Sequence, residues 1–122
     1  MKTIKTAIFA VVLGISFTAQ ATSMPSEIFK PRGAQTIKSQ AQGNGEYEAE
    51  FRVQKSKNSV PALAKQAIRH AQSKGFRVVE QEIDREDADL KFRRGNHELS
   101  ISIEDKDNGW IEIDQDLDIE RR

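Results

Sequence analysis

Five carboxylates occupy alternate positions near the end of this 122-residue chain. They fall in the stretch WIEIDQDLDIE, residues 110–120, where acids alternate with mostly apolar residues. Such a row could bind a divalent cation, attract a cationic partner, or form the solvated side of a strand. The five residues, called the acidic row below, are Glu112, Asp114, Asp116, Asp118 and Glu120.

The spacing of the acidic row does not suit a metal site. Alternate residues of a strand are about 6.6 Å apart, whereas Ca²⁺ gathers six to eight oxygens at about 2.4 Å. A calcium-binding loop starting at Asp105 would need Gly at its sixth position and Glu at its twelfth. The chain has Trp110 and Asp116 there. We therefore predict no metal site and no cofactor.

Two other interpretations of the acidic row stay open. The last strand of a meander is often an edge, and a row of like charges opposes the addition of another strand. This protection explains the row adequately. Recognition of a cationic protein or peptide is the alternative, supported by Trp110, although a cation–π contact with Lys106 would also explain that residue. The candidate partner-binding residues are Trp110, Glu112, Asp114, Asp116, Asp118 and Glu104.

Other chemistry has little support in the sequence. The chain has no cysteine, which excludes thiolate catalysis and thiolate metal sites. Ser100 and Ser102 lack a base at a suggestive spacing, and His70 and His97 lack the spacing of metal ligands. The 19 Lys and Arg residues balance 19 Asp and Glu residues, which argues against nucleic-acid binding. We predict a protein that is not an enzyme.

The N-terminus predicts export. Lys2 and Lys5 precede an apolar run over residues 7–17, and Ala19-Gln20-Ala21 has the form of a cleavage site. The run is too short for a spanning helix, which needs about 20 residues. We expect residues 1–21 to be a signal peptide, leaving a periplasmic or secreted protein without a membrane anchor. The sequence leaves its oligomeric state open.

One domain is expected after a lead-in. Residues 22–45 are polar and punctuated by Pro and Gly, which predicts an extended or disordered segment. Residues 46–122 form the domain. Its first strand is EYEAEFRVQ, which alternates with period two. A helix with an apolar stripe then runs from Val60 to Gly75, with Ser59 as its N-cap.

Four further strands complete a meander. The strand over residues 76–83 should direct Val79 and Ile83 inward. A two-residue turn at Gly95-Asn96 and a three-residue loop, Asp107-Asn108-Gly109, keep apolar residues on one face. The pairs expected are Phe92–Leu99, Leu90–Ile101, Arg93–Glu98, Ile103–Ile113 and Leu99–Leu117. The fold class is α+β, in the order β-α-β-β-β-β, with one helix on one face of an antiparallel sheet.

Residues 60–113 resemble the PepSY domain, a small exported module. The similarity lies in ALAKQAIRHAQSKG, in EIDRED before a strand, and in ISIEDKDNGWIEI. The strand order is also similar to the cystatin fold, although the inhibitor loops of that family are absent. The matching positions are structural and imply no catalytic residue: Ala64, Ala67, Ala71, Gly75, Asp105, Gly109 and Ile111.

The resemblance implies a protein that restrains or chaperones an exported protease or another envelope protein. We therefore expect a small exported binding module that acts by protein–protein contact. Binding of divalent cations at low affinity in the envelope is the alternative function.

Overall fold

The computed structural model of the protein describes residues 24–121, so the predicted signal peptide lies outside the described part of the chain. No helix within this part is long and apolar enough to cross a membrane. The elements are β1 (Gln35–Gly43), β2 (Glu46–Gln54), a 3₁₀ turn η2 (Lys55–Lys57), α1 (Val60–Ser73), β3 (Arg77–Ile83), β4 (Asp87–Arg94), β5 (His97–Asp105) and β6 (Trp110–Ile119).

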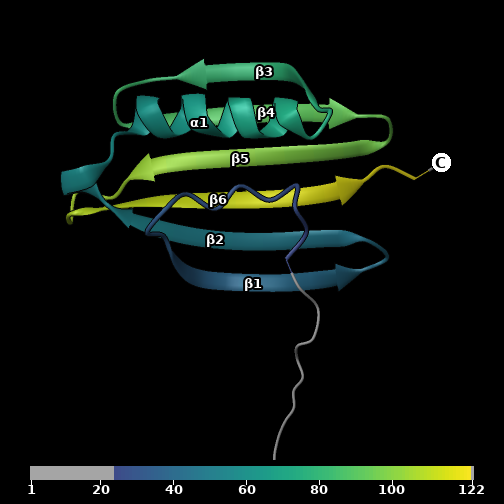
Figure 1. The fold of residues 1–122 in the computed structure, drawn as a ribbon, viewed down its shortest axis with the longest axis horizontal. Helices are drawn as coiled ribbons and strands as arrows, with labels where there is room; N and C mark the ends of the chain where they lie inside the picture. Colours follow the sequence, from purple (N-terminus) through teal and green to yellow (C-terminus); the bar gives the residue numbers. More distant parts are fainter. Residues whose placement is uncertain (1–23, 122) are drawn as a thin grey trace, which may run out of the picture.

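One antiparallel sheet carries the single helix on its inner face (Figure 1). The strand order is β1-β2-β6-β5-β4-β3, and α1 contacts β3, β4 and β5. The α+β class is therefore confirmed, with six strands instead of the five expected. The opposite face of the sheet, called the open face below, is not covered by any described element.

The helix begins and ends as its sequence predicts. Ser59 accepts a hydrogen bond from the backbone N–H of Ala62 at 3.3 Å, and Pro61 lies in the first turn. Gly75 has a φ of +89°, and Phe76 folds back to donate its backbone N–H to the carbonyl of Ala71. The buried stripe consists of Val60, Leu63, Ala64, Ala67 and Ala71.

The register of the meander is also confirmed. Gly95 has a φ of +61°, as the predicted two-residue turn requires. A hydrogen bond of 3.0 Å from Lys106 N–H to the Trp110 carbonyl closes the three-residue loop, in which Gly109 has a φ of +91°. All five predicted cross-strand pairs are present: Phe92–Leu99, Leu90–Ile101, Arg93–Glu98, Ile103–Ile113 and Leu99–Leu117.

The position of β6 corrects one expectation. The strand that carries the acidic row is not an edge, because β2 pairs with one side of it and β5 with the other. Since β2 returns to the end of the meander, the last strand becomes a central one. Protection of a sheet edge therefore does not explain the acidic row.

The lead-in contributes to the domain, so the boundary predicted at residue 46 is too late. Its second half is β1, which pairs with β2. Its first half, residues 24–34, crosses the inner face over β6 and β2 beside the helix (Figure 1). This segment is called the strap below. Ile28 and Phe29 are buried in the core. The strap covers the half of the sheet that α1 does not reach.

A buried glutamine anchors the strap. Gln115 points inward from β6 and is only 1% exposed. Its side-chain oxygen accepts from the backbone N–H of Phe29 at 2.8 Å, and its Nε2 donates to the Phe29 carbonyl at 2.5 Å. Both polar atoms of the amide are thus satisfied, as burial requires. Arg94 adds an ion pair to Glu27 at 2.9 Å.

Both edge strands are irregular. The pairing of β1 shifts at Ile37, and the pairing of β3 shifts at Val79. The pairing of β1 shifts again at Gln42. Ile37 and Val79 are the exposed large hydrophobics of the described chain, at 47% and 42%. The expectation that Val79 points inward is wrong, because the bulge moves the inward position to Val78, whereas Ile83 packs against the core as expected.

Replacing Gln115 by Leu tests the anchor. The variant leaves the buried N–H and carbonyl of Phe29 without partners, so we expect a loss of about 2 to 4 kcal/mol in unfolding free energy. Urea unfolding measures the loss, and hydrogen exchange of the Phe29 amide should accelerate. Gln72→Leu, on the exposed side of α1, is the control. Unchanged exchange at Phe29 would contradict the role assigned to Gln115.

Candidate functional site

The acidic row lies on the open face with acids beside it on both neighbouring strands. In the β2–β6 register, Glu48 faces Asp116 and Glu50 faces Asp114. In the β5–β6 register, two further acids from β5 face members of the row, in the pairs Glu104–Glu112 and Glu98–Asp118. Like charges directly opposite one another destabilise a sheet. The centre of the open face therefore concentrates negative charge at a cost in stability.

Three carboxylates converge at this centre. Oxygens of Glu50, Glu112 and Asp114 lie within 4.8 Å of one another. Burial raises the pKa of Glu50, and the charges of Asp114 and Glu112 raise it further. The pKa of Asp114 is also raised, first by burial and then by Glu112. Partial burial and like charges nearby thus oppose the ionisation of Glu50 and Asp114.

The pKa values of Asp116 and Asp118 are shifted in the same direction. Burial raises the pKa of Asp116, and so does its hydrogen bond with Glu48. The pKa of Asp118 is raised by burial and by the charges of Glu46 and Glu98. Glu48 differs, because its ion pair with Lys38 at 2.7 Å lowers its pKa.

Two shallow depressions flank β6 on the open face. Each has a volume of about 250 Å³, and both are lined by Asp114 and Asp116. The depression on the β2 side adds Glu48 and Glu50, with Lys38 at its border. The other is lined on the β5 side by Ser100, Ser102 and their neighbours on β3 and β4. Both can accommodate a side chain from a partner.

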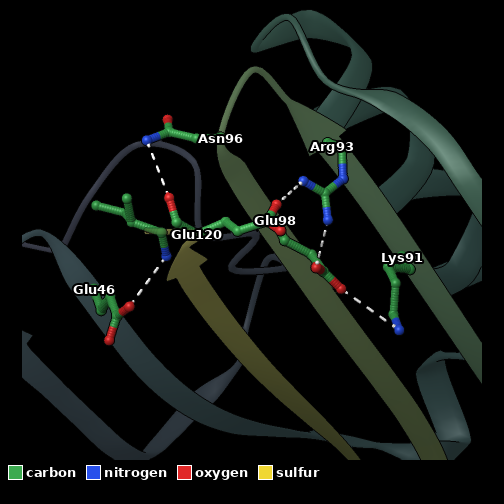
Figure 2. A network of polar contacts seen from close by, with 7 residues as sticks. Glu46, Lys91, Arg93, Asn96, Glu98 and Glu120 are labelled. Atoms are coloured by element: carbon green, nitrogen blue, oxygen red, sulfur yellow. Dashed lines mark hydrogen bonds and ion pairs between the residues drawn. The ribbon is translucent and has the colours of Figure 1, made fainter. Parts of the chain in front are cut away.

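The end of the row near the C-terminus is neutralised (Figure 2). Arg93 bridges Glu120 at 2.7 Å and Glu98 at 3.0 Å. Lys91 also contacts Glu98, at 3.5 Å, and Asn96 donates to the Glu120 carbonyl. The uncompensated charge of the open face is therefore centred on the middle of β6.

The opposite end of the row carries Trp110. Its ring lies 4.0 Å from the Arg52 guanidinium in a cation–π contact. The expected contact with Lys106 is therefore replaced by one with Arg52, from the neighbouring strand β2. Lys106 instead pairs with Glu104 at 3.3 Å. Trp110 is half-buried, so it forms one wall of the surface instead of projecting from it.

The structure brings most of the predicted site residues onto one surface. Glu112, Asp114 and Asp116 lie at its centre, with Asp118 beyond them, while Glu104 is engaged by Lys106. Glu48 and Glu50 were not among the predicted partner-binding residues, although the alternation of their strand puts them on this face. Lys38, which reaches the face from β1, was not predicted either.

Comparison with family models, curated proteins and solved structures finds no match to this chain. The resemblance to the PepSY domain and the export of the protein therefore stay predictions.

The raised pKa values predict that the protein becomes more stable as the pH falls from 7 toward about 4. Four carboxyl groups bind protons more tightly in the folded state, so lowering the pH favours folding until their ordinary values of 3.8 to 4.5 are reached. These four groups are Glu50, Asp114, Asp116 and Asp118. Urea unfolding at several pH values measures the change in unfolding free energy. Below that range the unfolding free energy should fall again. Glu27, Glu48 and Asp105 have lowered pKa values, so their protonation at lower pH removes a stabilising contribution.

A single substitution isolates the effect. Asp114→Asn should raise the unfolding free energy at pH 7 by about 0.2 to 1 kcal/mol, the range of a cross-strand pair, and reduce its pH dependence. Asp105→Asn is the matched control with the opposite sign, because Asp105 pairs with Lys55 at 2.7 Å. If Asp114→Asn destabilised the protein as Asp105→Asn does, the repulsion on the open face would be refuted.

Proposed function

We propose that this protein is a small exported, non-enzymatic binding module whose open face recognises a cationic segment of another protein. The observation that carries the proposal is the set of like-charge pairs around a central strand. Four acids of β6 face four acids of its neighbours. Since β6 is not an edge, protection against the addition of another strand does not account for this cost.

The shape of the surface supports a protein segment as the ligand. The two depressions could take Lys or Arg side chains, because Asp114 and Asp116 are in the lining of both. Burial raises the pKa values of these acids and the charges of neighbouring carboxylates raise them further, and a bound cation would offset both effects. Trp110 borders the acidic centre and offers an apolar contact at its end.

The resemblance to the PepSY domain extends the proposal to the partner. A protease or another envelope protein with an exposed basic segment would be restrained or chaperoned by this contact. A fold resemblance alone does not determine function, so the binding test below uses a defined basic probe.

Binding of an octalysine peptide tests the acidic face. We expect salt-sensitive binding, with chemical-shift changes at the backbone amides of β6 and β2. The Asp114→Asn/Asp116→Asn double variant should bind about fivefold more weakly or worse, since each exposed pair contributes up to about 1 kcal/mol.

The control double variant is Glu82→Gln/Glu86→Gln, which makes the same change in net charge away from the row. Equal loss in both variants would mean that only net charge matters, and it would refute the proposed surface. A pull-down from an envelope extract, repeated with both variants, then tests whether a natural partner uses the same residues.

A second candidate function is low-affinity binding of divalent cations. The convergence of Glu50, Glu112 and Asp114 within 4.8 Å favours it, because two strands supply the oxygens that one strand cannot. A titration with Ca²⁺, Mg²⁺ and Zn²⁺ followed by NMR decides between the candidates. Shifts confined to these three residues, abolished by Glu50→Gln, would support the cation. No such shifts would end this alternative.

A further inference from the structure

A separate pocket lies at the Trp110 end of the open face. Its volume is about 490 Å³, larger than either depression beside the acidic row and within the usual range of small-ligand sites. Three segments meet around it: the turn before β1, the end of β2 with η2, and the start of β6. The lining residues are Arg32, Gly33, Gln35, Gln54, Lys57, Asn58 and Trp110.

The charge of this pocket is opposite to that of the acidic row. Arg32 and Lys57 line it, and the Arg52 guanidinium stacks on the ring of Trp110, a third lining residue. None of these three cations forms an ion pair among residues 24–121, whereas seven other ion pairs occur there. The lining contains no carboxylate among the described residues. Uncompensated cations around a concave surface favour an anionic ligand.

The remaining lining groups are amides and one aromatic ring. Gln35 accepts from Arg52 Nε at 2.9 Å, and its NH₂ group makes no hydrogen bond within residues 24–121. Asn58 is held by its bond to the Gln54 carbonyl at 2.9 Å, and the Gln54 side chain makes no hydrogen bond among the described residues. Trp110 supplies an apolar wall. Amides suit hydroxyl groups, and an aromatic ring suits the C–H face of a sugar.

We propose that this pocket binds an acidic sugar, with its carboxylate between Arg32 and Lys57 and its ring against Trp110. Each class of lining group then has a counterpart: cations for the carboxylate, amides for the hydroxyls, and the indole for the ring face. The site is distinct from the acidic row, which would repel the same ligand, and it goes beyond the protein-binding role proposed above.

Trp110 makes the test direct, because it is the single tryptophan of the chain. Its fluorescence is followed during titration with methyl β-glucuronide, methyl β-glucoside and acetate at constant ionic strength. The glucuronide should bind about tenfold more tightly than either control, since only it combines ring and charge. NMR shifts should appear at the side-chain amides of Gln54 and Asn58.

Substitutions locate the charge. Arg32→Ala and Lys57→Ala should each weaken glucuronide binding about fivefold or more, whereas Lys65→Ala, exposed on α1, should leave it unchanged. All three side chains are exposed, so folding is preserved. Equal binding of acetate would reduce the pocket to a general anion site, and equal binding of the glucoside would remove the role of charge. Either result, no binding at all, or shifts on the acidic row instead, would overturn the proposal.

Discussion

The alternation of side chains along β6 is the constraint on which the rest of the protein depends. Each residue of a strand points to the face opposite its neighbours, and β6 lies in the middle of the sheet with a partner on both sides. Its apolar residues therefore build the centre of the core, while its acids must face the acids of β2 and β5. The composition of the core and the charge of the open face therefore both follow from the alternating sequence of β6.

The same alternation explains what could be predicted. Local signals sufficed for the helix, for both hairpin turns and for the register of the meander, because each depends on residues close in sequence. The membership of the open face followed from parity alone. The order of the strands could not be predicted from the sequence. The strands β2 and β6 pair although they are far apart in the chain, and no connecting turn indicates this pairing. The centre of the site was therefore mistaken for an edge.

The strap and the bulges were missed for different physical reasons. Residues 24–34 have no periodicity, and their attachment depends on the width of the sheet relative to one helix. Gln115 was the available signal, since a glutamine within an apolar set needs a buried partner. The bulge at Val79 shifts the inward position by one residue, which no alternation pattern reveals. The pocket lined by Arg32 and Lys57 lies between the strap, β2 and β6. It could not be predicted because the position of the strap was not predicted.

The contact between the strap and β6 also orders the assembly of the protein. Phe29 and Gln115 are 86 residues apart, so the first described segment has no surface to bind until the final strand has been synthesised. The β1–β2 hairpin also requires β6 to join the rest of the sheet, because β6 lies between β2 and β5. Contacts of such long range form slowly. The strap and the β1–β2 hairpin can therefore complete the inner face and the sheet only after β6 is available.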